Sequence, residues 1–129
     1  MNGYLVATSV ALIATSQPEL LTGKVRAAVE RGPGFLSVIS YWEVMVKSMK
    51  GMLEVGDPRL WFGETIDALA LRPLLLRPEH VTTLFRLPPL HRDPFDRALI
   101  AQASSENLTL LTTDRTIPSY APAHLRVIR

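Results

Sequence analysis

The sequence contains no cysteine among its 129 residues. It therefore has no disulfide framework, no thiolate zinc site and no thiol nucleophile, which fits a reducing cytosol, and we expect a cytoplasmic protein. Histidine is scarce as well. His80, His91 and His124 are scattered rather than spaced as paired ligands, which argues against a zinc site.

Long hydrophobic runs and a strong excess of one charge are also absent. The apolar stretch 4–14 is broken by Thr8 and Ser9, and no basic residue precedes Lys24. It lacks the basic start of a signal peptide and the length of a membrane span, so we expect no membrane association. The formal net charge is only +2, so any binding to nucleic acid must rely on a local basic patch.

The chain does contain enough apolar residues, 47% of its length, to bury the core of one domain spanning residues 1–129. Short aliphatic runs alternate with amphipathic segments, which is typical of crossover units around a parallel sheet. We predict an α/β fold, a three-layer α/β/α sandwich with a mainly parallel sheet. The predicted strands are 4–6, 35–39, 108–111 and 125–128, with 71–76 as an edge strand because of Pro73. The predicted helices are 18–31, 41–50, 58–69, 78–85 and 94–106.

Four acids fall where a site forms in such a fold, beyond the carboxyl ends of the strands. Glu43 follows strand 35–39, Asp114 follows strand 108–111, and Asp93 and Asp96 begin the helix at Pro94. Each also has a purely structural interpretation. Ser40 to Glu43 fits a capping box, Asp93 is a good N-cap, and the helix dipole favours Asp96.

A metal ion explains the four acids better than separate helix caps. Asp96 borders the apolar face formed by Leu99 and Ile100, where a carboxylate is costly unless something pairs with it. Converging carboxylates also repel one another unless a cation lies between them, and Mg²⁺ or Mn²⁺ takes oxygen ligands. The sequence therefore predicts a divalent metal held by Glu43, Asp93, Asp96 and Asp114.

Three segments carry a family resemblance: YLVATS at 4–9, SVISYWE at 37–43, and LPPLHRDPFDR at 87–97 running into LIAQA at 99–103. With these motifs, over nearly its whole length, the chain resembles PIN-domain ribonucleases of the VapC kind, the toxins of toxin–antitoxin pairs. The resemblance implies an Mg²⁺- or Mn²⁺-dependent endoribonuclease that cleaves RNA, a homodimer and a VapB-like antitoxin. By position, Glu43, Asp96 and Asp114 look like its catalytic, metal-binding acids, with Asp93 as an accessory ligand.

The sequence departs from the family pattern at Ala7. An aspartate is expected directly after the first strand, and here the following Thr8 and Ser9 persist while that carboxylate is missing. The metal would lose one contact and the attacking water one orienting group. An engineered substitution and natural loss both account for Ala7. The alternative function is a non-catalytic, degenerate module that binds RNA or an antitoxin. An aspartyl phosphotransfer domain is disfavoured, because Ala7 removes the nucleophile and no glycine-rich phosphate loop is present.

Basic and aromatic side chains near these motifs have both functional and structural interpretations. Arginines at 92, 97 and 115 could hold phosphates, although arginines near acids are more often solvated ion-pair partners. Trp42 could stack a base, but a role in the core or in helix packing is the commoner one. The helical stripe of Trp61, Phe62, Ile66 and Leu69 indicates core packing, or a dimer or antitoxin surface where exposed.

Overall fold

The computed structural model describes residues 3–88, 93–120, 122 and 124–129. Its five-stranded sheet has the order β3-β2-β1-β4-β5, and every neighbouring pair is parallel. The predicted α/β fold with a parallel sheet is therefore confirmed. The first strand has the predicted bounds, and the other four are shorter than predicted. The bounds are β1 Tyr4–Val6, β2 Gly34–Ser37, β3 Arg72–Leu74, β4 Thr109–Leu111 and β5 Val127–Ile128.

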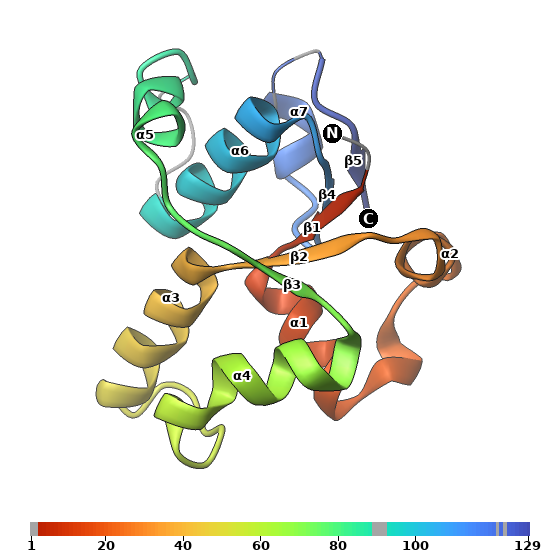
Figure 1. The fold of residues 1–129 in the computed structure, drawn as a ribbon. Helices are drawn as coiled ribbons and strands as arrows, with labels where there is room; N and C mark the ends of the chain where they lie inside the picture. The colour runs from red at the N-terminus through yellow and green to blue at the C-terminus, as the bar shows by residue number, and fades with distance from the viewer. Residues whose placement is uncertain (1–2, 89–92, 121, 123) are drawn as a thin grey trace.

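Helices connect the strands and cover both faces of the sheet, with α1 and α4 below it and α5, α6 and α7 above it in Figure 1. Their bounds are α1 Thr8–Ser16, α2 Gly23–Arg31, α3 Val38–Met49, α4 Pro58–Leu69, α5 Pro78–Leu84, α6 Pro94–Glu106 and α7 Ile117–Tyr120, with a 3-10 turn, η1, at Pro18–Leu20. The predictions for α4 and α6 are confirmed to the residue.

In the N-terminal part, one predicted helix is wrong and another helix was missed. The sequence analysis proposed one helix over 18–31, but the chain forms a 3-10 turn and then a new helix, because the Thr22 hydroxyl caps α2 by accepting from the Val25 amide. Helix α1 was not predicted at all. Its apolar residues surround most of the helix and do not follow the one-sided pattern that identifies a surface helix.

The central strand β1 is buried on both faces, as expected for a parallel sheet. Side chains alternate along it, so Leu5 joins the core beneath α5 and α6, while Tyr4 and Val6 join the core shared with α1 and α4. Gly34 pairs with Tyr4 across β1 and β2, and a side chain at Gly34 would collide with the tyrosine ring. The strand ends at Val6, so Ala7 and Thr8 lie at its carboxyl end, where α1 begins.

The strand β3 lies at one edge of the sheet. Pro73 sits in its middle, paired with Leu36 of β2. A proline has no amide hydrogen to donate, so it is tolerated where one side of the strand has no neighbour. The prediction that this segment forms an edge strand is confirmed.

Candidate functional site

A cleft of about 430 Å³ opens beyond the carboxyl ends of β1 and β4, beside α3 and the start of α6. Its lining includes the four acids that the sequence analysis singled out: Glu43, Asp93, Asp96 and Asp114. The other polar residues that line it are Thr8, Ser9, Lys47, Thr112 and Thr113. The structure brings the four acids to one cleft, and their role as metal ligands stays a prediction.

Glu43 lies in the second turn of α3 and is 4% exposed. The helix begins earlier than predicted, because the Ser37 hydroxyl caps it by accepting from the Ile39 amide. The capping-box interpretation of Ser40 and Glu43 is therefore wrong. Ser40 lies inside the helix, and its hydroxyl accepts a hydrogen bond of 2.8 Å from the Thr8 hydroxyl. Glu43 is thus buried at a position where it does not cap the helix.

One cation reaches Glu43 from within the same helix. The Lys47 ammonium lies 2.7 Å from Oε2 of Glu43, while Oε1 is buried and has no hydrogen-bond partner. The hydrogen bond to Glu43 raises the pKa of Lys47 above its usual value; burial opposes this rise, and the charges of Glu43, Asp93 and Asp96 add to it. Sequence reasoning missed Lys47, although its spacing of four residues after Glu43 is that of a helical ion pair.

Asp93 and Asp96 project from the start of α6. Asp93 is the N-cap, and its Oδ1 accepts from the amides of Phe95, at 2.9 Å, and Asp96, at 3.3 Å. The cap interpretation of Asp93 is confirmed, and one of its oxygens is already committed to the helix. Asp96 lies in the first turn of the same helix, partly buried, and lines the cleft.

Asp114 lies in the loop after β4. Its Oδ1 accepts from the amide and the hydroxyl of Thr116, at 2.8 and 2.7 Å, and its own amide donates to the Thr112 hydroxyl at 3.0 Å. On the other side of the cleft, the Thr113 hydroxyl donates to that of Ser9 at 2.8 Å. These bonds hold the β4 loop against the start of α1.

Ala7 occupies the N-cap position of α1. Its amide donates to the carbonyl of Leu111 at 2.8 Å, but its side chain offers no oxygen to the helix, and the residue is 3% exposed. A helix start without a capping side chain forgoes about 1 kcal/mol relative to an aspartate or asparagine. An aspartate at this position would therefore cap α1, next to Thr8 and Ser9 of the cleft.

A buried polar network ties α3 to α5 and α6. The Ser37 hydroxyl donates to the side-chain oxygen of Gln102, and the Gln102 amide lies 3.3 Å from Nδ1 of His80. Because Nδ1 accepts from the Arg77 amide, Nε2 of His80 carries the proton and donates to Glu106 at 3.2 Å. This network sets α3 against α6, the helices that carry Glu43 and Asp96.

The cleft fits a divalent cation by its chemistry, although its side chains are not yet gathered around a single point. No group of three acidic or histidine side chains among residues 3–88, 93–120, 122 and 124–129 stands close enough to hold an ion as arranged. The buried Oε1 of Glu43 nevertheless has no partner, and a hard cation takes such an oxygen together with nearby carboxylates and water. Binding would require these side chains to turn toward the cation.

Two residues considered as RNA contacts have partners within the protein. The Arg97 guanidinium donates to the carbonyls of Pro88 and Leu84, so it holds the preceding loop and pairs with no acid in these bonds. Residues 89–92 of the motif, with His91 and Arg92, lie outside the described residues. Trp42 of α3 is 59% exposed, so it is not a core residue, but it packs edge-on against Phe95 of α6 with ring centroids 5.4 Å apart, which confirms its interpretation as a helix-packing aromatic.

The aromatic stripe on α4 belongs to the core. Trp61 is 6% exposed, and Phe62, Ile66 and Leu69 pack against the same cluster. Phe62 also stacks on Tyr41 of α3, with ring centroids 5.1 Å apart. The core interpretation of this stripe is confirmed.

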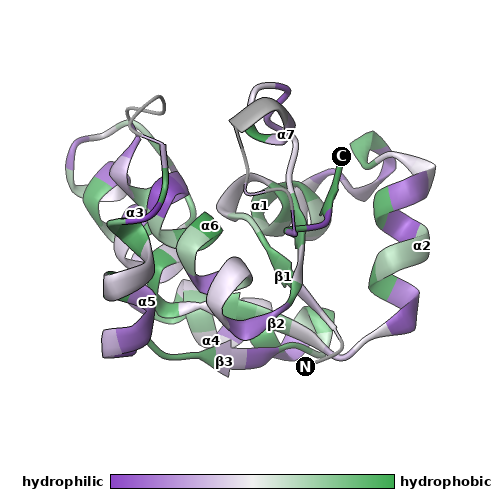
Figure 2. Ribbon diagram, turned by 90° about the horizontal axis from the view of Figure 1, so that it is seen from above, coloured by the Kyte–Doolittle hydropathy of each residue, from purple (hydrophilic) through white to green (hydrophobic). Residues whose placement is uncertain are grey.

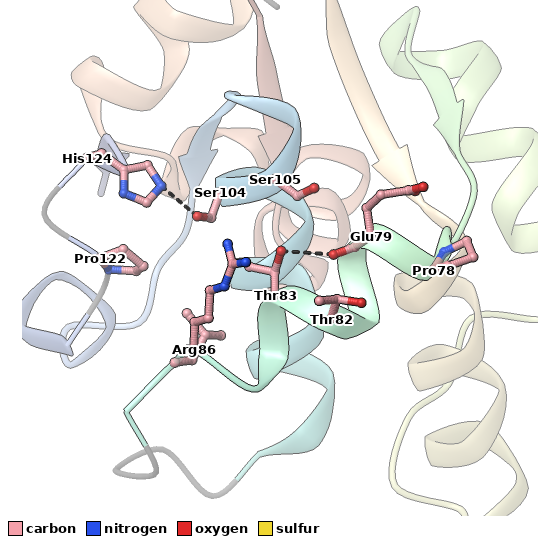
Figure 3. A pocket seen from close by; sticks show the side chains of 10 residues that line it. Pro78, Glu79, Thr82, Thr83, Arg86, Ser104, Ser105, Pro122 and His124 are labelled. Carbon is pink, nitrogen blue, oxygen red and sulfur yellow. Dashed lines mark hydrogen bonds between the residues drawn. The ribbon is translucent and has the colours of Figure 1, made fainter.

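A larger pocket of about 640 Å³ lies between α5, the C-terminal half of α6 and the segment around His124. Figure 3 shows the His124 ring directed toward the Ser104 hydroxyl, at 2.7 Å, and the Thr83 hydroxyl directed to the Glu79 carbonyl. Glu79 is the single acid among the described residues that line it. The size of this pocket does not make it the metal site, because a hard cation needs several oxygen anions.

No helix within the described part of the chain is long and apolar enough to span a membrane.

The comparisons with known proteins place the fold. No curated protein matches the sequence. Similar solved structures include VapBC2 from Rickettsia felis bound to a promoter DNA fragment, with 15% identity, coverage of 99% of this chain and 98% of that one, and a TM-score of 0.71. DNA-bound VapBC from Salmonella typhimurium has 12% identity, coverage of 99% of this chain and 98% of that one, and a TM-score of 0.69. VapBC-5 from Mycobacterium tuberculosis, described as a toxin–antitoxin system, has 20% identity, coverage of 99% of this chain and 98% of that one, and a TM-score of 0.61.

The family assignment rests on the sequence itself. Residues 4–121 match the profile of the PIN domain. This span includes strands β1 to β4 and all four acids of the cleft. The chain therefore belongs to the PIN domain family.

Proposed function

We propose that this chain is a VapC-type toxin whose carboxylate cleft cleaves phosphodiester bonds of RNA with the help of Mg²⁺ or Mn²⁺. The observation that carries the proposal is the cleft itself, where Glu43, Asp93, Asp96 and Asp114 meet and Glu43 keeps a buried oxygen without a partner. A buried carboxylate oxygen without a partner is costly, and a bound cation would satisfy it.

In this proposal Glu43, Asp96 and Asp114 hold the ion and Asp93 assists through the oxygen that does not cap α6. An ion held there would supply positive charge beside the scissile phosphate and would lower the pKa of the attacking water. The carboxylates would orient that water for attack. The Ser9 hydroxyl, which accepts from Thr113, lines the same cleft and can donate to a phosphate oxygen, whereas the hydroxyl hydrogens of Thr8 and Thr113 are already donated to Ser40 and Ser9. Ala7 leaves one carboxylate missing, so we expect slow cleavage in the chain as it stands.

The proposal includes two protein partners. The similar structures from Rickettsia felis and Salmonella typhimurium are VapBC complexes, and we propose a VapB-like antitoxin for this chain. We also propose a homodimer, because large apolar side chains remain exposed on α3 and around α5, among them Trp42 at 59%, Val81 at 51% and Phe85 at 95%. Such exposed apolar groups mark interaction surfaces. An RNA-cleaving toxin acts in the cytoplasm, where its substrate is.

The second candidate is a non-catalytic PIN-like module that binds RNA or an antitoxin. Ala7 favours it, since no carboxylate stands at the start of α1, and Lys47 already neutralises part of the charge of Glu43.

Calorimetric titration with Mn²⁺ separates the two candidates. The nuclease proposal predicts saturable binding that weakens in Glu43→Gln and Asp96→Asn, with Glu79→Gln as the control, because Glu79 lies in the separate pocket of Figure 3. Equal binding by all four proteins, or none by any, would count against the metal site and favour the non-catalytic module.

A further inference from the structure

A second surface of the molecule is strongly basic. A groove of about 560 Å³ runs between α2 and β5, and its lining includes Lys24, Arg31, Arg126 and Arg129 but no acid. It continues into a hollow of about 210 Å³ that shares Arg31 and Arg126. We infer that this groove binds the phosphate backbone of an RNA strand whose scissile bond lies in the carboxylate cleft, an inference that rests on the proposed function.

The groove is built into the helix that forms its wall. Lys24, Ala27, Ala28 and Arg31 line it at helical spacing, so one face of α2 presents two cations separated by two alanines. Lys24 and Arg31 are seven positions apart, which is about 10 Å along the helix. Glu30, the acid of α2, is not among the residues that line the groove. This face of α2 therefore carries a cation at each end and two small side chains between them.

One end of the groove, at Lys24 and Arg129, lies near the cleft, while Arg31 and Arg126 lie toward the amino ends of β1 and β4. The Thr112 amide, at the cleft, donates to the carbonyl of Ile128 in β5 at 3.0 Å, and neighbouring strands lie about 4.8 Å apart. The Thr22 hydroxyl, which caps α2, donates to the carbonyl of Arg129 at 3.0 Å. Figure 2 shows the C-terminus of the chain, which follows β5, on the same side of the molecule as α2. One extended strand of nucleotides can therefore contact both.

The lining favours nucleic acid over a protein partner. The apolar groups in the groove are two alanines and the half-buried Val127 and Ile128, and the groove has no aromatic or methionine anchor. Protein interfaces depend on such anchors in their centre. Single-stranded nucleic acid instead follows grooves lined by cations, largely independently of sequence. The modest net charge of +2 conceals this patch, because acids gather in the cleft.

Binding of a labelled single-stranded RNA, measured in EDTA with the full chain, tests the inference without requiring cleavage. Arg31→Gln/Arg126→Gln should lower the affinity at low salt at least about tenfold and reduce the salt slope by about 1.4, near 0.7 for each cation removed. Lys24→Gln, which removes one cation, should reduce the salt slope by about 0.7. The control pair, Arg72→Gln/Arg86→Gln, removes two exposed arginines, one on β3 at the far edge of the sheet and one after α5. It should leave the affinity within about twofold. Arg129 is the last residue of the sequence and stays unchanged.

The outcomes also separate this inference from the proposed function. If the groove variants lose RNA binding while no metal-dependent cleavage is found in Ala7→Asp, the groove stands and the nuclease proposal fails. If Ala7→Asp cleaves RNA and the groove variants, folded by their melting curves, bind RNA as tightly as the control pair, the groove assignment is overturned. If the groove variants lose binding to an acidic peptide but keep their RNA affinity, the groove assignment is also overturned, in favour of a protein partner.

Discussion

The Lys47 ammonium lies 2.7 Å from one oxygen of Glu43, whose other oxygen is buried without a partner. The buried carboxylate thus has one side neutralised from within its own helix and the other available to the cleft. A lysine in this position acts in two opposing ways. It stabilises Glu43 when no metal is present, and its charge repels a cation that approaches the same carboxylate.

Lys47→Met should separate these two effects. Without metal, the variant leaves Glu43 unpaired, and we expect the free energy of unfolding to fall by about 1 kcal/mol, at the low end for a lost charged partner because Lys47 is 40% exposed. With the repulsion removed, Mn²⁺ should bind several-fold more tightly. Melting curves with EDTA and with Mn²⁺ measure both effects. A variant that loses stability equally in the two conditions would show that Lys47 does not oppose the metal.

Ala7→Asp and Ala7→Asn form a matched pair, since both side chains cap a helix equally well and differ mainly in charge. Each should gain up to about 1 kcal/mol from capping α1, reduced in both by the same crowding at a buried position. In EDTA, the aspartate variant should melt below the asparagine variant because the cleft acids repel it.

Addition of Mn²⁺ should reverse that order. If Mn²⁺ raises the melting temperature of the asparagine variant as much as that of the aspartate variant, position 7 does not contribute a ligand. The absence of the family's aspartate at Ala7 would then have no consequence for metal binding.

The antitoxin should bind regardless of Ala7, because helix-packed surfaces depend on the fold and not on one ligand. We expect co-expression with the product of the adjacent gene to give a stable complex in which an antitoxin arginine approaches Glu43, Asp96 and Asp114 in place of the cation. Mn²⁺ affinity of the complex should then be lower than that of the free chain. Failure to co-purify the adjacent gene product, or unchanged Mn²⁺ affinity in a complex that forms, would contradict this.

The sequence predicted the position of the acids because topology alone determines it. In a parallel sheet, residues that follow β2 and β4 emerge at the same edge, so Glu43 and Asp114 could be placed together without side-chain detail. The proline at the start of α6 and the aspartate before it gave the helix start to the residue.

Other features were missed because their signals are spread over the chain or hidden by composition. Helix α1 lies in a stretch that is apolar on most sides, so no helical period stands out. Ser37 was placed in the middle of a strand over 35–39, although β2 ends there and its hydroxyl caps α3, and that error shifted the expected role of Glu43. The basic groove joins α2 to β5, which are far apart in the sequence, and neither segment is notably basic alone.

The central claim is that the four-acid cleft is a metal-dependent RNA-cleaving site, and the most direct test is cleavage of labelled RNA with Mn²⁺ in the Ala7→Asp background. Glu43→Gln and Asp96→Asn should each abolish most turnover. Asp96→Asn should leave the metal-free protein at least as stable, since one repelling charge is removed, whereas Glu43→Gln also loses the ion pair with Lys47. Asp93→Asn should keep most turnover, because asparagine caps α6 as well as aspartate does. Full Mn²⁺-dependent cleavage by both Glu43→Gln and Asp96→Asn would place the chemistry elsewhere and contradict the account.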